Sequence, residues 1–150
     1  YSSYENIDAV FFGSNISYYH KYFDINAAYT WAENISAGKP MPEIAPLNVS
    51  AVLKSPKFFE VNAYLTGTFN DAQTRIDETL SESSTPSWFR LDFGLYTMFE
   101  NYALSLTAEN ILNETYYRHL SYMRDPFASG FSVYEPGTTV RITLSYNGIE

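Results

Sequence analysis

Apolar and polar residues alternate with a period of two over long runs, and this pattern constrains the fold more than any other feature of the 150-residue sequence. From Phe23 to Trp31 the odd positions are Phe, Ile, Ala, Tyr and Trp, whereas the even positions are Asp, Asn, Ala and Thr. Because successive side chains of a strand point to opposite faces, the pattern predicts strands with one apolar and one polar face. We expect seven of them, at residues 8–20, 22–33, 46–54, 58–69, 88–99, 101–116 and 134–146.

The predicted strands are long, and their connections differ in length in a regular order. Strands of soluble proteins usually have about five or six residues, whereas a tilted strand of about ten residues spans the hydrocarbon layer of a membrane. Tight turns near residues 20–21, 55–57 and 100–101 alternate with long polar connections at 34–45, 70–87 and 117–133. Short turns on one side and long loops on the other are typical of an antiparallel transmembrane β-barrel.

Aromatic residues make up 18% of the sequence and gather near the predicted strand ends, where a membrane barrel carries its interfacial aromatic girdles. These residues are Tyr18, Tyr19, Trp31, Phe58, Phe59, Trp88, Phe99, Tyr116 and Tyr117.

Charge and composition exclude several classes of function. A formal charge of −8 argues against a binder of nucleic acid, which needs a basic surface. No cysteine is present, so a thiolate nucleophile and a cysteine-based metal site are excluded. The two histidines, His20 and His119, lie far apart in the sequence, and no Gly-x-Ser-x-Gly motif occurs. The acidic pair Asp77-Glu78 is expected to be solvated in a loop. We therefore expect neither an enzyme nor a bound cofactor.

The number of predicted strands is odd, whereas a closed antiparallel barrel needs an even number. The first residues, Tyr-Ser-Ser-Tyr-Glu, also lack the basic start and apolar run of a signal peptide. We expect either a missing strand or a piece of a larger barrel.

Two short motifs near the end of the chain carry a resemblance to a known family. Glu109-Asn110 lies in the run Leu-Thr-Ala-Glu-Asn-Ile-Leu-Asn-Glu-Thr-Tyr, and Glu135-Pro136-Gly137 precedes the last predicted strand. This arrangement resembles the C-terminal end of TonB-dependent outer-membrane receptors. Thr138 stands where that family usually has arginine, and the chain ends four residues after Tyr146 rather than on an aromatic residue.

The resemblance implies that residues 1–150 are about seven C-terminal strands of a 22-stranded barrel, with the plug and the earlier strands absent. Such a receptor lies in the outer membrane of a Gram-negative bacterium, in contact with its lipid. It takes energy from the TonB–ExbB–ExbD system through the plug, and it imports a scarce ligand such as a ferric siderophore or another metal chelate, copper chelates included.

The connection at 117–133 holds the densest set of candidate ligand-binding residues. His119 and Met123 are soft-metal donors that suit copper, and arginine and tyrosine side chains suit an anionic chelate. The candidate residues are Arg118, His119, Tyr122, Met123 and Arg124. The alternative is that these residues only order the loop.

Charged residues of the polar face are expected to line the lumen, with Arg90 or Arg141 close enough to pair with Glu109. The polar-face residues in question are Glu60, Arg90, Asp92, Glu109 and Arg141. Two other classes remain open. A passive porin-like barrel shares the alternation and the unequal loops, and a soluble β-sandwich that binds carbohydrate shares the aromatic residues.

Overall fold

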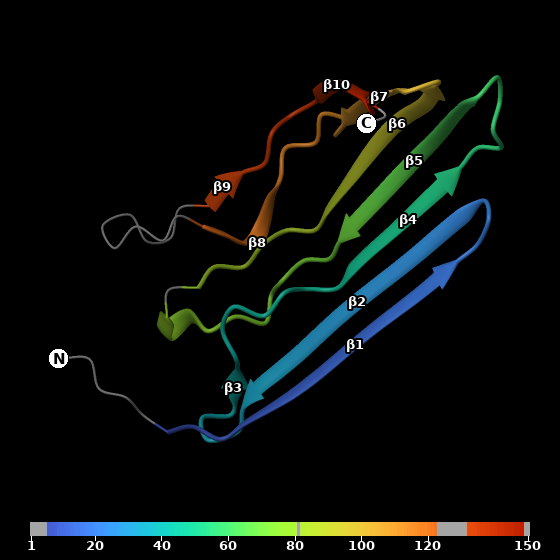
Figure 1. The fold of residues 1–150 in the computed structure, drawn as a ribbon. Coiled ribbons are helices and arrows are strands. Elements are labelled where there is room, and N and C mark those ends of the chain that lie inside the picture. The colour runs from blue at the N-terminus through green and yellow to red at the C-terminus, as the bar shows by residue number, and fades with distance from the viewer. Residues whose placement is uncertain (1–5, 81, 123–131, 149–150) are drawn as a thin grey trace.

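The computed structural model describes residues 6–80, 82–122 and 132–148, and its main feature is one antiparallel meander (Figure 1). Neighbouring strands follow the order β1-β2-β4-β5-β6-β7-β10. Their bounds are β1 Ala9–Tyr19, β2 Phe23–Asn34, β4 Asn48–Lys54, β5 Val61–Asn70, β6 Trp88–Phe99, β7 Tyr102–Glu109 and β10 Thr139–Tyr146. The short β3 (Lys39–Pro40) pairs with the end of β2, and β8 (Tyr117–Tyr122) pairs with β9 (Ser132–Tyr134) in a separate hairpin. The described part contains one short 3-10 helix, η1 (Glu78–Leu80).

The strand registers place most apolar residues on one face and most polar residues on the other. One row across the apolar face reads Phe23, Leu53, Leu65, Phe93, Ala108 and Val140 from β2 to β10. A row on the opposite face reads Asn26, Ser50, Thr68 and Arg90. The alternation in the sequence therefore has the same phase in every strand, and the expected division into two faces is confirmed.

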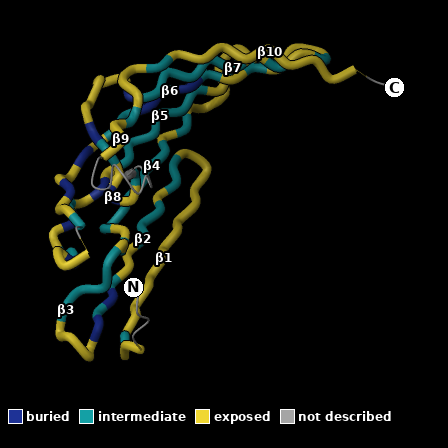
Figure 2. Tube along the Cα trace, turned by 90° about the vertical axis from the view of Figure 1, so that its left-hand side faces the viewer, coloured by how far each residue is buried: buried dark blue, intermediate teal, exposed yellow. Residues whose placement is uncertain are grey.

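The apolar face is not covered by any other described part of the chain. Buried apolar side chains are few, namely Ala32, Trp88 and Tyr116. By contrast, Leu104 is 44% exposed and Ile142 is 71% exposed, and exposed residues run along the outer strands (Figure 2). Apolar patches of this extent are rare on soluble monomers and mark contact with a membrane or a partner.

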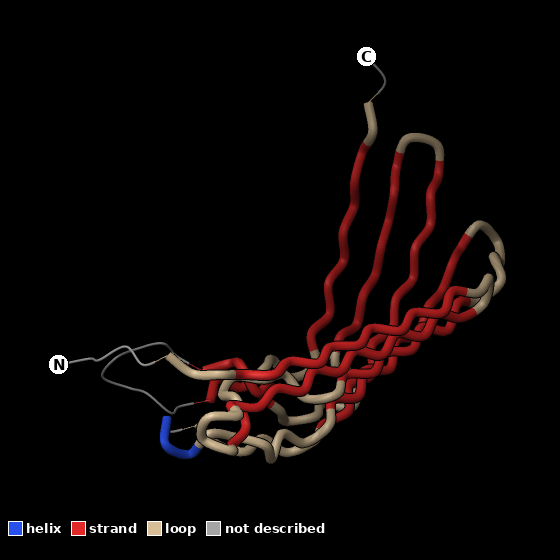
Figure 3. Tube along the Cα trace, turned by 90° about the horizontal axis from the view of Figure 1, so that it is seen from below, coloured by secondary structure: helices blue, strands red, loops and turns tan. Residues whose placement is uncertain are grey.

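The short and long connections lie at opposite ends of the strands, as expected. The turns after β1, β4 and β6 are short, whereas the connections that carry β3, η1 and the β8–β9 hairpin gather at the other end (Figure 1). Seen from below, the sheet bends strongly, and the strands near the C-terminus turn away from the direction of the N-terminal ones (Figure 3). In the described residues the sheet is open, with β1 and β10 at its edges.

Three predicted strand boundaries were wrong because residues with positive φ or a proline end the pairing. The strand expected at 101–116 stops at Glu109, since Asn110 has a φ of 52° and turns the chain. The strand expected at 134–146 is split into β9 and β10 by the turn at Pro136. The strand expected at 58–69 begins at Val61, because Glu60 has a φ of 65°.

One further expectation was also wrong. Glu60 belongs to the turn, where it pairs with Lys57, and so it does not line the polar face. The long connection expected at 117–133 carries the β8–β9 hairpin, which the sequence did not indicate.

Candidate functional site at the long-loop end of the sheet

The Glu-Asn and Glu-Pro-Gly motifs meet in the structure through the side chain of Asn110. This residue is the most deeply buried large side chain in the described part of the chain. Its Nδ2 donates to the carbonyl oxygens of Glu114 (2.9 Å) and Pro136 (3.1 Å), and its Oδ1 accepts from the Glu114 amide (2.9 Å). Asparagine tolerates positive φ and binds nearby backbone groups, which explains why it stands at this turn. The asparagine therefore fixes the end of β7 against the turn that precedes β10.

Neighbouring residues complete this junction. The Asn110 amide donates to Asp92 Oδ1 on β6 (2.8 Å), and the Thr138 hydroxyl donates to the Asn110 carbonyl (2.8 Å). A Cβ on Gly137 would come within 2.7 Å of Asn113 Oδ1, the end of an exposed side chain that would have to move. Glu109 is the last residue of β7 and pairs with Thr139. Thr138, the departure from the family pattern, thus has a structural contact of its own.

Arg90 does not pair with Glu109, contrary to expectation. Its Nη2 lies 2.8 Å from Asp92 Oδ2, and its Nη1 donates to the hydroxyl of Tyr116 (3.2 Å). Within the ranges that the structure describes, neither Arg90 nor Arg141 forms an ion pair with Glu109. Arg90 and Asp92 are two residues apart on one strand, so their side chains share a face.

Trp88 and Tyr116 are not part of an interfacial girdle. Trp88 pairs with Asn70 on the polar face, and its ring centroid lies 4.2 Å from that of Tyr116. Both side chains are buried. The other aromatic residues expected at strand ends include Phe58, Phe59 and Phe99, which are exposed at the short-turn end.

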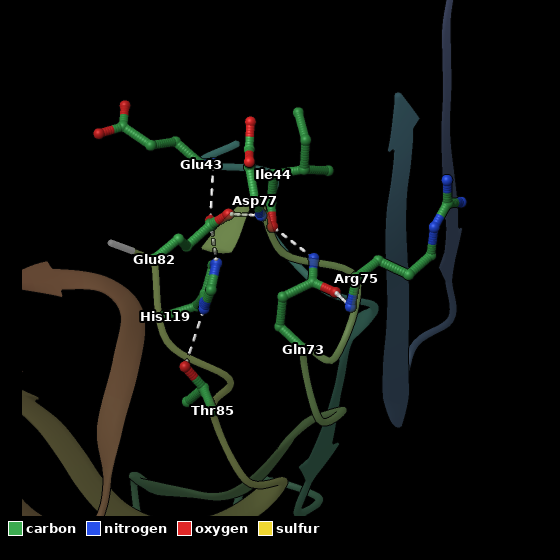
Figure 4. Close-up of polar contacts among 8 residues, drawn as sticks. All are labelled: Glu43, Ile44, Gln73, Arg75, Asp77, Glu82, Thr85 and His119. Atoms are coloured by element: carbon green, nitrogen blue, oxygen red, sulfur yellow. Dashed lines mark hydrogen bonds and ion pairs between the residues drawn. The ribbon is translucent and has the colours of Figure 1, made fainter. Parts of the chain in front are cut away.

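Glu82 joins all three long connections (Figure 4). Its Oε1 accepts from the Glu43 amide (2.8 Å) and lies 2.9 Å from His119 Nε2, while its Oε2 accepts from the Asp77 amide (2.7 Å). Gln73 adds a second link, because its Nε2 donates to the Ile44 carbonyl (2.6 Å). Segments far apart in the sequence are thus held as one cluster.

His119 is buried, and both of its ring nitrogens have partners. Nδ1 lies 2.8 Å from Thr85 Oγ1, and Nε2 lies 2.9 Å from Glu82 Oε1. If the threonine hydroxyl donates to Nδ1, the neutral ring donates from Nε2 to the carboxylate, and each polar atom is satisfied. A metal ion would have to displace one of these partners to reach the ring. In residues 6–80, 82–122 and 132–148 no group of three His, Cys, Asp or Glu side chains is placed to hold a metal.

Asp77 is buried, which corrects the expectation that it is solvated, whereas Glu78 is exposed, as expected. The carboxylate is 2.8 Å from Lys39 Nζ and accepts from the hydroxyl of Thr79 (2.5 Å). The hydrogen bond from Lys39 and then that from Thr79 lower the pKa of Asp77 below its ordinary value of 3.8. The interaction ties the first long connection to the second.

The remaining candidate residues are divided between described and undescribed parts of the chain. Arg118 lies on β8, where its Nε is 3.0 Å from Glu135 Oε1. Tyr122 ends β8 and its backbone pairs with Ser132. Met123 and Arg124 lie outside the described residues.

A cavity of about 390 Å³ lies between the polar face and the loops. Its wall on the sheet side is formed by residues of β4, β5 and β6, such as Asn48, Thr68 and Trp88. Residues 118–120 of β8 and the segment Ala45–Pro46 close it on other sides. Sequence reasoning missed this cavity because it depends on how the hairpin folds over the strands.

The fold matches that of part of a known transporter. The chain superposes on the copper transporter OprC with a TM-score of 0.78 and 21% sequence identity, over 94% of this chain and 24% of that one. The chain thus spans about a quarter of the length of the transporter. No family model and no curated sequence matches it. Among the described residues no helix has the length and hydropathy to cross a membrane. What the comparison shows is a shared all-β antiparallel fold.

Proposed function

We propose that this chain is a C-terminal wall segment of an outer-membrane β-barrel receptor that imports a metal ion or a metal chelate. The uncovered apolar face, continuous over all seven strands of the meander, is the observation that carries this proposal. Contact of such a face with lipid is energetically favourable, whereas its exposure to water is unfavourable. The shared fold with OprC supports the same location and the same general class of cargo.

The finer proposal is that the receptor is TonB-dependent and non-enzymatic, with a 22-stranded barrel. The junction at Asn110 supports it, because the two motifs that carry the family resemblance come together there in a single set of hydrogen bonds. The energy would come from the TonB–ExbB–ExbD system through a plug domain. Open edges at β1 and β10 fit strands of a larger barrel, since an unpaired edge is not tolerated in lipid.

Ligand contact is assigned to the long-loop end of the sheet. Arg118 and His119 of β8 line the cavity, and Tyr122 ends the same strand. Met123 and Arg124 follow Tyr122 in the sequence and are candidates by their chemistry alone, since they lie outside the described residues. Copper is one candidate cargo, as the name of the transporter with the shared fold suggests; ferric siderophores are another.

The test is metal uptake by a Gram-negative host that expresses the full-length protein carrying this chain. Copper and iron in washed cells are measured by mass spectrometry, with the host TonB present or deleted. We expect one metal to accumulate only with TonB. Equal uptake without TonB would identify a passive porin-like barrel, and a protein recovered in the soluble fraction would refute the membrane assignment.

Two substitutions separate direct metal contact from chelate contact. If His119 or Met123 binds copper directly, His119→Ala and Met123→Ala each reduce copper uptake. Unchanged uptake in both variants would exclude direct coordination and leave recognition to the arginine and tyrosine side chains.

A further inference from the structure

The cavity at the long-loop end has a floor built from paired residues on three adjacent strands. Asn48 of β4 pairs with Asn70 of β5, and Ser50 pairs with Thr68. Thr68 in turn pairs with Arg90 of β6. The floor therefore presents amide, hydroxyl and guanidinium groups in two adjacent rows of the polar face, and residues 118–120 of β8 line the same cavity.

The charge of the lining differs from that of the chain as a whole. The chain has a formal charge of −8, yet the described residues that line this cavity include two arginines and no carboxylate. Amides and hydroxyls can donate hydrogen bonds as well. A cavity with this lining is complementary to a ligand that carries negative charge and many oxygen atoms.

The two arginines are held in different ways. Arg90 uses both terminal nitrogens inside the protein, on Asp92 and Tyr116. Arg118 is fixed through Nε by Glu135 (3.0 Å), and its side chain is 56% exposed. Its two terminal nitrogens form no hydrogen bond with the described residues. A guanidinium anchored at Nε presents these nitrogens as a fork, which matches a carboxylate in a bidentate geometry.

His119 has a structural role in the wall of the cavity. It lines the same cavity, but both ring nitrogens are engaged by Thr85 and Glu82. It therefore holds the hairpin against the second long connection and leaves recognition of a ligand to its neighbour Arg118.

From this geometry we propose that the cavity binds a carboxylate group of an anionic, oxygen-rich metal chelate, with Arg118 as the contact residue and Glu135 as the residue that positions it. The inference rests on the proposed import function and names the class of cargo. It also gives Glu135 of the Glu-Pro-Gly motif a role in orienting a ligand-binding side chain.

The experiment measures binding to the purified full-length protein in detergent. The probes are ferric citrate, which carries carboxylates, and an uncharged ferric trihydroxamate chelate. We expect ferric citrate to bind and the uncharged chelate to bind at least about tenfold more weakly, since charge-assisted bidentate bonds are lost. Similar affinity for both chelates, or no binding of ferric citrate, would overturn the proposal.

Variants assign the interaction to Arg118. Arg118→Gln lowers ferric citrate affinity by about tenfold or more, and Arg118→Lys restores it only in part because lysine lacks the fork. Glu135→Gln gives a smaller loss that disappears when Arg118→Gln is already present. Arg75→Gln is the matched control, because Arg75 is a loop arginine that stacks on Trp31 and pairs with Glu33 away from this cavity.

The alternative is that Arg118 pairs only with a carboxylate of the receptor itself. If so, Arg118→Gln would lower the unfolding temperature of the unliganded protein and leave its affinity for ferric citrate unchanged, and this result would contradict the proposal. TonB-dependent uptake of a metal with no effect of Arg118→Gln on any probe would refute this inference alone. Absence of TonB-dependent uptake in the wild type would refute the proposed function, while binding in the cavity is still measured in detergent.

Discussion

Replacing Asn110 by alanine tests the junction between β7 and β10 most sharply. The variant removes three hydrogen bonds of the side chain, with Glu114 twice and with Pro136 once. At about 1 kcal/mol for each bond, the loss is about 3 kcal/mol, and it is larger where the freed backbone groups stay buried. Alanine at a φ of 52° adds about 1 kcal/mol. The expected loss of stability is therefore about 4 kcal/mol.

Asn113 offers a matched control within the same turn. It also has a φ of 52°, but its side chain is exposed and, among the described residues, accepts one hydrogen bond, from the Thr138 amide (3.2 Å). Asn113→Ala thus keeps the backbone cost and loses little else, about 2 kcal/mol in all. Asn110→Gly measures the loss of the side-chain hydrogen bonds alone, because glycine removes the side chain without the backbone cost of positive φ.

The assay is unfolding of the full-length protein by urea in lipid vesicles, followed by tryptophan fluorescence. Trp88 stacks on Tyr116 beside the junction and should report its loss. We expect stability to fall most in Asn110→Ala, less in Asn110→Gly and least in Asn113→Ala. Equal losses in the two alanine variants would refute the claim that the buried side-chain bonds of Asn110 hold the junction.

Three further predictions concern the sheet, the loops and the topology. Gly94→Ala should destabilise the protein by about 1–3 kcal/mol, because the ring of Tyr64 on the neighbouring strand occupies the place of the new Cβ; a loss that Tyr64→Ala does not reduce would contradict this packing. Because the pKa of Asp77 is lowered in the folded protein, its ionised carboxylate stabilises the loop cluster above about pH 3.8. This stabilisation is lost as the pH falls through the folded-state pKa. Pepsin should therefore cut the 71–87 connection faster as the pH falls below about 3.8, and Lys39→Gln should move that onset upward; an onset unchanged by Lys39→Gln would refute the assignment. A membrane-impermeant maleimide on intact cells should label Ser83→Cys in a long connection and not Lys57→Cys in a short turn, and the reverse result would invert the topology.

The two faces of the sheet were readable from the sequence because the alternation depends only on neighbouring residues. Rows such as Leu95, Leu106 and Ile142 follow once each strand has a definite phase. The unequal lengths of the connections could be predicted for the same reason, because the residue types that favour turns and loops can be recognised in short stretches of the sequence.

The end of β7 and the start of β10 were missed because the conformation of one residue decides both boundaries. Asn110 fits the end of a strand as well as a turn, and only the partners it binds, Glu114 and Pro136, show which conformation it takes. The β8–β9 hairpin was missed because Tyr117 pairs with Tyr134 across an intervening segment that carries no hairpin signal.

The loop cluster could not be foreseen because its partners are distant in the sequence. Asp77 looks like an ordinary loop carboxylate until Lys39 is placed beside it. Likewise, Arg118 stood out in the sequence for its chemistry, but its anchoring by Glu135 depends on the hairpin. Met123 and Arg124 remain predictions, since they lie outside the described residues.

The central claim is that one face of this sheet contacts lipid and the other does not, and a pair of adjacent substitutions on β7 tests it. Leu106 lies between Leu95 and Ile142 on the apolar face, whereas Ser105 lies between Tyr96 and Thr143 on the polar face. Leu106→Arg in the full-length protein should cost about 2–4 kcal/mol in vesicle unfolding and reduce the amount assembled in the outer membrane. Ser105→Arg should leave both nearly unchanged. Equal losses in the two variants, or a greater loss for Ser105→Arg, would contradict the assignment of this chain to a membrane barrel.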